Sequence, residues 1–324
     1  MLLFIKLILT IGRKLTAVNV FAYNRPVHLK RVLDGLSSCN RFNEVKVAIY
    51  IDGPLNNFDL QKISQVSKIA NNFTKKYGGE VYAAGYNKGL ARSLISGISE
   101  SFRSNKTLIV LEDDIIPSYY FLDFMLDGLA KYKTNSRIAS ISGYLPNLKK
   151  QIQAPFFRRG ADCWGWATWH DRWSAVNWDS KYLLETIIEN NLQKAFNLNN
   201  SYCFTCMLKR QMNEEIDSWA IRWHASMFVQ NKLTLYPNKS LVTNIGFDGS
   251  GTHGGINNFY NSQISNERII IPDIDISESK LVLKEFQKTY ERYFKAGIRI
   301  RVLRFLKRKV TLNKAIISKY FRYN

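Results

Sequence analysis

Three consecutive acidic residues, Glu112, Asp113 and Asp114, directly follow an apolar stretch of the chain. That stretch, residues 107–111, contains only apolar or β-branched side chains, which is typical of a strand buried on both faces. Adjacent carboxylates repel one another unless a cation lies between them, and their hard oxygens suit Mg²⁺ or Mn²⁺. Such ions commonly complete their coordination with substrate phosphates. The three acids therefore predict a divalent-metal site at the end of a buried strand.

Four more charged residues, Arg25, Asp52, Lys88 and Arg92, follow the other predicted strands of the first half. The carboxyl ends of parallel strands share one edge of a sheet, where ligands bind in open α/β folds. Carboxylates there can accept hydrogen bonds from a base or ribose, and cations can face phosphates. The chain contains neither G-x-G-x-x-G after its first strand nor G-x-x-x-x-G-K-[ST]. A nucleotide diphosphate is therefore favoured over a dinucleotide or P-loop ligand.

The elements that must position these residues alternate between strand and helix. Their βαβαβαβ order predicts an α/β fold with a Rossmann-like, mostly parallel sheet and helices on both faces. The strands of this part are expected at 17–22, 45–51, 80–84 and 107–111, with helices at 26–38, 60–77 and up to about 102. Farther along, patterning predicts strands at 137–142, 233–236, 240–244 and 269–271, and helices at 119–132, opened by Pro117, and at 183–196, 201–212 and 216–231.

Tryptophan is concentrated in one segment of the second half. Residues 163–178 hold five of the seven tryptophans. Tryptophan faces stack on sugar rings, and they also fill hydrophobic cores. We expect most of the five to lie in the core, with one or two of Trp164, Trp166 and Trp169 lining a donor or acceptor pocket.

Seven short motifs, taken together and in order, resemble the nucleotide-diphospho-sugar glycosyltransferases of the GT-A fold. They are VFAYNRP at 20–26, IDG at 51–53, NKGLARS at 87–93, LEDD at 111–114, GWATW at 165–169, DSW at 217–219 and GSGTHGG at 249–255. The sequence is most similar to the N-acetylglucosaminyltransferase I branch and to bacterial family 2 enzymes. The resemblance covers residues 17–256 and implies transfer of a sugar from a nucleotide-sugar donor.

For the donor, the resemblance implies roles at the predicted sheet edge. Asp52 would recognise the uracil or ribose, and Arg25 would contact the nucleotide. Asp114 would be the direct metal ligand, while Asp113 and Glu112 would hold the sugar, the ribose or metal-bound water. Lys88 and Arg92 would complete the donor site.

For the second half, the resemblance assigns two residues. Asp217 matches the catalytic base of the family's acidic-tryptophan element. His253, in the glycine-rich segment 246–255, matches a histidine that closes over the diphosphate or the metal. Ser93 stands near a point where animal members of the branch use a histidine against the base, which puts the identity of the donor in doubt.

The base can also be argued from chemistry. Inverting transfer needs a carboxylate near the acceptor hydroxyl, most effective when burial raises its pKa. Glu214, Glu215 and Asp217 are candidates, and Asp217 is preferred because Trp219 and Trp223 give it the more apolar setting. Asp is also a favoured helix N-cap, so Asp217 can instead cap the helix that follows.

The charge of the chain is far from neutral. The formal net charge is +20, and residues 295–324 carry half of it, with ten Lys or Arg and no Asp or Glu. There the cations alternate with apolar residues, as in helices that lie on anionic membranes. A solvated basic helix and an RNA-binding segment are alternatives, but the chain carries no nucleic-acid motif, so nucleic acid is not an expected partner.

The N-terminus and the cysteines indicate the compartment. Residues 1–14 contain about ten apolar positions interrupted by Lys6, too few to span a bilayer, and no signal-cleavage site follows. Four cysteines without a dense pattern favour a reducing compartment, and the single C-x-x-C at Cys203 and Cys206 is expected to be part of a helix face. We expect a cytoplasmic protein bound peripherally to the inner face of the plasma membrane.

The prediction is thus an apolar extension at 1–16, a GT-A glycosyltransferase domain at 17–272 and a basic amphipathic region at 273–324. This last region is expected to be a helical extension of the fold. The domain would comprise a nucleotide-sugar half, 17–145, and an acceptor half, 146–272. With Mn²⁺ or Mg²⁺, it would transfer a sugar, from a UDP-linked donor, to a saccharide or lipid-linked acceptor in surface glycan synthesis. The alternatives are a nucleotidyltransferase on the same fold and a non-catalytic sugar- or membrane-binding protein.

Overall fold

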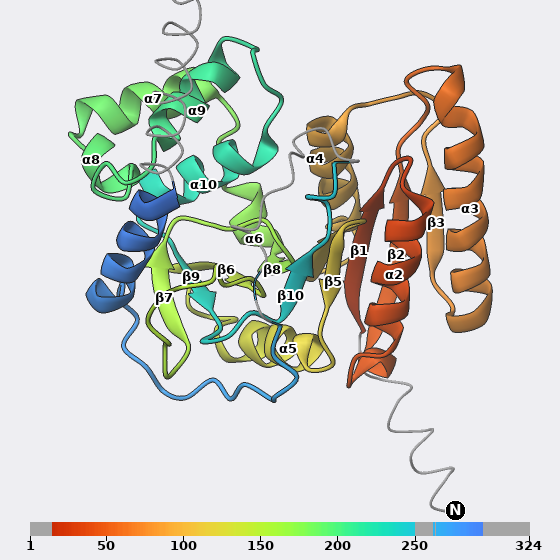
Figure 1. The fold of residues 1–324 in the computed structure, drawn as a ribbon, viewed down its shortest axis with the longest axis horizontal. Helices are drawn as coiled ribbons and strands as arrows, with labels where there is room; N and C mark the ends of the chain where they lie inside the picture. Colours follow the sequence, from red (N-terminus) through yellow and green to blue (C-terminus); the bar gives the residue numbers. More distant parts are fainter. Residues whose placement is uncertain (1–14, 250–261, 263, 294–324) are drawn as a thin grey trace, which may run out of the picture.

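The computed structural model describes residues 15–249, 262 and 264–293 (Figure 1). The main strands are β1 Thr16–Ala22, β2 Val45–Ile51, β3 Glu80–Ala83, β4 Thr107–Glu112, β6 Ile138–Ser142, β7 Phe156–Arg159, β8 Trp166–Trp169 and β9 Leu233–Tyr236. They form one sheet in the order β3-β2-β1-β4-β8-β6-β9-β7. Four strand pairs are parallel and three are antiparallel. The predicted α/β class with a mostly parallel sheet is confirmed.

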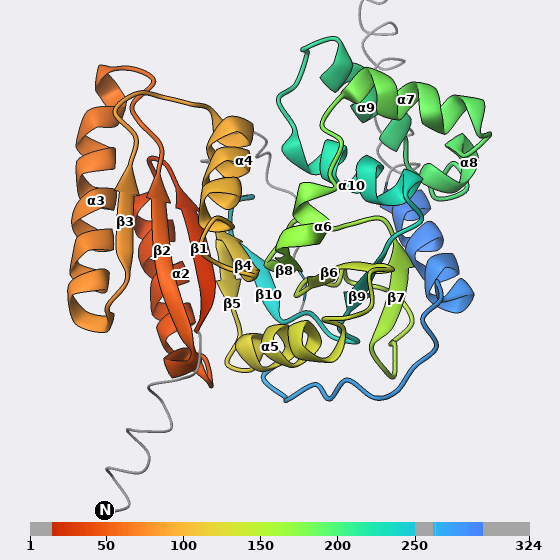
Figure 2. The ribbon, with the colours of Figure 1, turned by 180° about the vertical axis from the view of Figure 1, so that it is seen from behind.

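Helices cover both faces of this sheet (Figures 1 and 2). They are α2 Pro26–Ser37, α3 Asn57–Tyr77, α4 Leu90–Ser101, α5 Phe121–Lys131, α6 His170–Ser174, α7 Ser180–Glu189, α8 Gln193–Phe196, α9 Phe204–Met212 and α10 Trp219–Val229. A 3-10 turn, η1 Phe42–Glu44, precedes β2. Residues 280–293 form a further helical segment.

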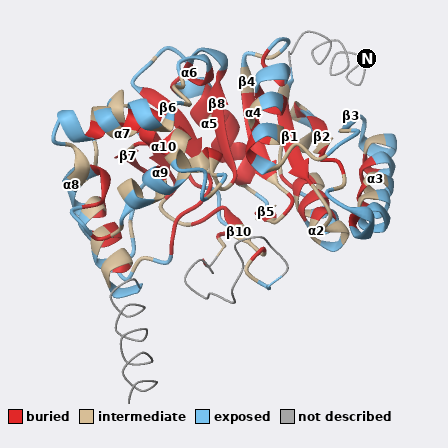
Figure 3. Cartoon of the chain, turned by 90° about the horizontal axis from the view of Figure 1, so that it is seen from above, coloured by how far each residue is buried: buried red, intermediate tan, exposed pale blue. Residues whose placement is uncertain are grey.

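Alternation along the central strands builds the two hydrophobic layers. In β1, Val18 and Val20 pack in the cluster that contains α2, α3 and α5, whereas Ala17 and Phe21 pack in the cluster that contains α4 and α10. Successive side chains of a strand point to opposite faces, so a strand covered on both sides must be apolar throughout. Figure 3 shows the resulting buried centre with exposed helix faces around it.

The strands of the first half end at one common edge. Phe21 of β1 lies opposite Tyr50 of β2 on one side and Glu112 of β4 on the other. The residues that follow these strands are therefore brought to the same level of the sheet. This confirms the expected meeting of strand ends, which positions the candidate site.

Several predicted elements need correction. Strands β7 and β8 were not expected, nor was the small antiparallel sheet of β5 Ile115–Pro117 with β10 Val242–Asn244. Pro117 ends β5 and does not open a helix. The expected helix 183–196 is broken between α7 and α8, where Asn191 has a positive φ of 56°. Residues 269–271 form no strand.

The C-terminal helical segment packs on the sheet through Val282, Phe286 and Tyr290, which join Phe156 and Tyr236 in one cluster. Cys203, the N-cap of α9, and Cys206 within it form a disulfide that the sequence interpretation did not include, which weakens the argument for a reducing compartment. No helix within the described residues is long and apolar enough to cross a membrane. The predictions for residues 1–14 and 295–324 lie outside the described residues.

Candidate active site

The acidic residues at the end of β4 contact an arginine from the next loop along the edge. Arg25, the residue before α2, directs Nη2 to Asp113 Oδ1, and the same atom lies 3.0 Å from Asp114 Oδ2. The Tyr23 amide donates a hydrogen bond to Asp113 Oδ2 (3.2 Å). Asp113 is buried, with its side chain 4% exposed. Arg25 is thus held against the acids, as the sequence predicts for a shared edge.

The acids concentrate negative charge away from water. Burial, together with the nearby carboxylates of Asp114 and Asp113, raises the pKa of Glu112 to about 8. Burial also raises the pKa of Asp113 to about 6, although Arg25 opposes this. Burial by itself would lower the pKa of Arg25, but the two aspartates outweigh it and raise that pKa. An additional cation at this position would relieve the repulsion that remains.

The carboxylates fit a divalent cation that is shared with a ligand. Within the described part of the chain, no three His, Cys, Asp or Glu side chains converge on a protein-only metal site. Mg²⁺ is commonly held by one or two carboxylates together with substrate phosphates, which is the donor set that residues 112–114 offer. The Asp114 carboxylate also contacts Gly246, where an added Cβ would lie 2.3 Å from Oδ2. His253 lies outside the described residues.

Asp52 holds the turn that carries Lys88. Its Oδ1 accepts hydrogen bonds from the amides of Gly53 (2.9 Å) and Lys88 (2.8 Å), and Asn87 Nδ2 lies 3.4 Å from Oδ2. Asp52 is 6% exposed, so these bonds anchor a loop to the end of β2. The binding of a base or ribose by Asp52 stays a prediction. Oδ2 would have to accept the hydrogen bond from such a ligand, because Oδ1 already accepts two.

The two predicted donor-site cations lie beside that turn. Lys88 is half-buried and Arg92, near the start of α4, is exposed. Neither forms an ion pair with another described residue. Their position at the carboxyl edge agrees with the prediction, and their contact with a phosphate stays a prediction.

Asp217 lies at the same edge but not in the apolar setting that was expected. Its side chain is 61% exposed, and Oδ1 is 3.6 Å from Arg222 Nη2. Ser218, not Asp217, caps α10 by accepting a hydrogen bond from the Ile221 amide. A Cβ on Gly89 would lie 3.7 Å from Asp217 Oδ2, so Asp217 adjoins the turn that Asp52 anchors. The capping alternative and the burial argument are therefore both wrong, and the role of Asp217 as a base stays a prediction.

The three tryptophans separate into core and surface. Trp166 and Trp169 are 1% and 3% exposed, so both belong to the core, where most of the five tryptophans were expected. Trp166 packs against Trp219 and Trp223, and Trp169 Nε1 donates to the Leu129 carbonyl (3.3 Å). Their strand, β8, lies between β4 and β6 and is covered on both faces, which explains their burial. Trp164 is half-buried and does line a cavity.

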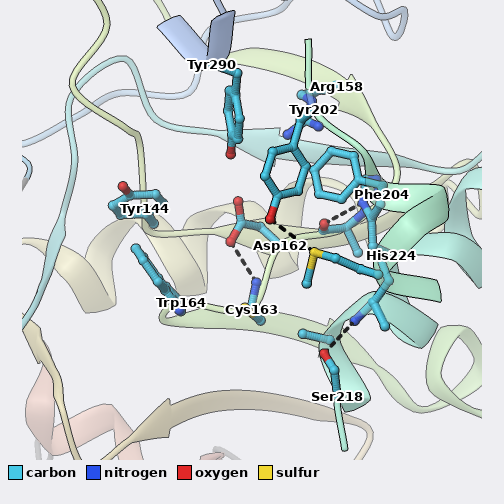
Figure 4. A pocket seen from close by; sticks show the side chains of 14 residues that line it. Tyr144, Arg158, Asp162, Cys163, Trp164, Tyr202, Phe204, Ser218, His224 and Tyr290 are labelled. Atoms are coloured by element: carbon cyan, nitrogen blue, oxygen red, sulfur yellow. Dashed lines mark hydrogen bonds between the residues drawn. The ribbon is translucent and has the colours of Figure 1, made fainter. Parts of the chain in front are cut away.

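That cavity, of about 170 Å³, is a feature that the sequence interpretation missed (Figure 4). Arg158, Asp162 and His224 line it together with aromatic side chains. Burial raises the pKa of Asp162 and lowers that of His224 to about 3. The signal available in the sequence was the pair Arg158 and Arg159, two cations directly after Phe156 and Phe157 in the short segment FFRR.

The cavity adjoins the acids at the end of β4. Trp164 contacts Phe247, the neighbour of Gly246, with ring centroids 5.7 Å apart. Burial raises the pKa of Cys163, also in the cavity wall, and the charges of Glu112 and Asp114 add to this effect. Ser218 lines the cavity next to Asp217 in the chain. The acids and Asp217 therefore each border the cavity through a neighbouring residue of its wall.

No protein-family model matches the chain, and no curated protein matches it. Among solved structures, S. aureus TarS 1–349 is 12% identical, covers 71% of this chain and 60% of its own, and has a TM-score of 0.41. GalNAc-T7 with UDP, GalNAc and Mn²⁺ is 10% identical over 70% of this chain and 43% of its own, with a TM-score of 0.41.

The mannosyltransferase PcManGT from Pyrobaculum calidifontis, in complex with GDP-Man and Mn²⁺, is 9% identical over 71% of this chain and 76% of its own, with a TM-score of 0.40. This chain spans 25% of the length of the matched S. aureus TarS chain and 60% of the length of TarS 1–349. TM-scores of this size do not establish a shared fold, so only the residues of this chain bear on its function.

Proposed function

We propose that this chain is a metal-dependent, inverting glycosyltransferase of the GT-A type. It moves a sugar from a UDP-linked donor to a hydroxyl of a saccharide or lipid-linked acceptor in surface glycan synthesis. The observation that best supports this is the grouping of residues 112–114, Arg25 and Asp217 at one sheet edge, next to a cavity lined by aromatic side chains. A diphosphate, a metal and a sugar acceptor each find suitable chemistry there.

Each group has a role in this proposal. A bound divalent metal would neutralise the charge that develops on the leaving diphosphate. Asp114 would hold it, and Arg25 would keep Asp113 and Asp114 in place while facing the nucleotide. Asp217 would accept the proton of the acceptor hydroxyl as the new bond forms.

The exposure of Asp217 favours a second candidate, a nucleotidyltransferase on the same sheet. Such an enzyme would join a nucleotide to a phosphorylated substrate, release pyrophosphate and have no use for Asp217. Release of a nucleoside diphosphate rather than pyrophosphate distinguishes the proposed transferase from this candidate.

A thermal-shift panel tests the proposal. UDP-, GDP-, CMP- and dTDP-sugars are compared with and without Mn²⁺ on the wild type, on Asp114→Ala and on the control Asp34→Ala, an exposed aspartate of α2. We expect one nucleotide to raise the melting temperature only with Mn²⁺, in the wild type and the control but not in Asp114→Ala. An equal shift in Asp114→Ala would remove Asp114 from the site. No shift with any donor would contradict the proposed function.

A further inference from the structure

Arg158 is a buried cation that the donor chemistry does not use. It lies on β7, its residue is 5% exposed, and it lines the cavity of Figure 4. Its Nε has no hydrogen-bond partner, and no ion pair joins its guanidinium to another described residue. Burying a charged group without hydrogen-bonded compensation is strongly unfavourable. We therefore expect a hydrogen-bond acceptor for this guanidinium to come from outside the described residues.

The nearest carboxylates are already engaged. Asp162 accepts hydrogen bonds from the Cys163 amide at Oδ1 (2.7 Å) and from the Tyr236 hydroxyl at Oδ2 (3.3 Å). Glu278 Oε1 accepts one from the Arg159 amide (2.9 Å). Both attract Arg158 electrostatically, but neither lies within ion-pair distance of it.

The remaining surroundings leave the N–H groups of Arg158 available. The guanidinium stacks on the Phe286 ring, with Cζ 4.8 Å from the ring centroid. This contact covers one face of the guanidinium and not the edge that carries its N–H groups. His224 is neutral near pH 7 because its pKa is lowered to about 3 by burial and by Arg158. Arg158 is therefore the only cationic side chain among the described residues that line the cavity.

The rest of the wall suits a sugar ring. Tyr144, Trp164, Tyr202, Phe204 and Tyr290 line the cavity, and Figure 4 shows them around Asp162, with Arg158 and Ser218 toward opposite ends of the view. Aromatic walls with a few polar groups are typical of pockets for small ligands, and aromatic faces stack on sugars.

We propose that this cavity binds a saccharide that carries an anionic group, carboxylate or phosphate, and that Arg158 pairs with that group. The identification of this saccharide as the acceptor rests on the proposed function, because Ser218 places the cavity next to Asp217. The planar guanidinium offers parallel N–H donors that match either anion. The substrate class is thus an acidic sugar and not a neutral one.

Direct binding tests this inference without any turnover. Methyl glucuronide, glucose 6-phosphate and neutral methyl glucoside are titrated into the full chain by calorimetry. We expect at least one acidic sugar to bind about tenfold or more tightly than methyl glucoside, the scale of one charge-assisted hydrogen bond. Glucuronide preference would identify a carboxylate, and glucose 6-phosphate preference would identify a phosphate.

Variants locate the effect. Arg158→Gln should abolish the preference, and Arg158→Lys should keep part of it because the charge remains. Arg159→Gln is the matched control, since Arg159 is on the same strand but is not among the residues that line this cavity. Near-UV circular dichroism checks folding, and the wild-type comparison decides the outcome if Arg158→Gln does not fold.

Three results would overturn the inference: equal affinity of wild type for acidic and neutral sugars, a preference that survives in folded Arg158→Gln, or no binding of either acidic sugar at about 10 mM, above ordinary substrate affinities. The thermal-shift panel of nucleotide sugars distinguishes failure of this inference from failure of the proposed function. A metal-dependent donor shift without acidic-sugar binding rejects only the cavity ligand. Acidic-sugar binding without a donor shift supports the cavity ligand and rejects the transferase.

Discussion

Asp217 is the residue on which the proposed transfer step depends most directly. Asp217→Asn removes the proton acceptor but keeps the shape of the side chain, which should lower turnover by about 10²-fold or more and leave donor affinity unchanged. Initial rates of nucleoside diphosphate release and calorimetric donor binding measure the two effects. Glu215→Gln is the control, because Glu215 is an exposed neighbour paired with Arg210 (3.3 Å). A fully active Asp217→Asn enzyme would exclude Asp217 as the base.

His224 gives a pH prediction for stability. Burial and Arg158 lower its pKa to about 3 in the folded chain, whereas an unfolded histidine titrates near 6.5. Between these values the unfolded chain binds the extra proton, so stability falls as the pH drops below about 6.5. The loss from this group should reach about 2 kcal/mol at pH 5, since each pKa unit corresponds to about 1.4 kcal/mol.

Urea unfolding at pH 7 and pH 5 measures this difference. His224→Phe retains an aromatic ring among Phe196, Phe204 and Phe228 but cannot titrate, so its stability should change less between the two pH values. His170→Phe, at an exposed position, should keep the wild-type dependence. The same slope in all three proteins would contradict the buried neutral histidine.

For individual residues, the sequence predicts which side chains lie together better than it predicts which of them are buried. Residues 112–114 and Arg25 were expected to meet, and they do, because a buried strand followed by charge is visible locally. The exposure of Asp217 and the burial of Arg158 were not visible, since both depend on how α10, β7 and the C-terminal helical segment pack. The concentration of tryptophans in the sequence did not show that Trp164 lines a cavity whereas Trp166 lies in the core.

Among the elements, the turn between β3 and α4 is anchored to the end of β2 by Asp52, with Asn87 Nδ2 also donating to the Gly53 carbonyl (2.9 Å). Asp52→Ala removes the acceptor of the Gly53 and Lys88 amides, which should lower the free energy of unfolding by about 1–3 kcal/mol. The loosened turn should also weaken donor binding, since it carries Lys88. Urea unfolding and donor titration measure both effects.

Asp34→Ala is the matched control for this change, because Asp34 is an exposed aspartate whose side chain pairs with Lys30, one turn away on α2. Unchanged stability of Asp52→Ala would show that the turn holds without its carboxylate. The sequence marked Asp52 as a ligand-binding residue because it ends a strand, and the structure adds an anchoring role that local sequence could not reveal.

The elements that the sequence did not predict are short and depend on distant partners. β5, β7 and β8 contain three or four residues, fewer than a periodic pattern needs. β8 is a strand because it pairs with β4 and β6, and β5 is one because β10 lies beside it. The longer helices and strands were predicted within a few residues, because their apolar periodicity does not depend on tertiary contacts.

Across the whole molecule, one sheet joins the two predicted halves. β4, from residues 17–145, pairs with β8, from residues 146–272, so the acids and the aromatic cavity share a rigid support. The antiparallel direction of β8 could not be inferred from the parallel pattern of the first half. This continuity brings Arg158 and Asp217 into one region with residues 112–114.

The charge of the chain is also a property of the whole molecule, and it predicts where the protein binds. Residues 295–324 supply ten of the cations and no acids, interleaved with apolar residues. Each cation near an anionic bilayer contributes about 1 kcal/mol, an attraction that salt screens. Deleting residues 295–324 should therefore release the protein from phosphatidylserine-containing liposomes at moderate salt, as measured by co-sedimentation, while donor binding persists. Neutral phosphatidylcholine liposomes are the control, and binding to anionic liposomes that survives the deletion would place the membrane contact elsewhere in the chain.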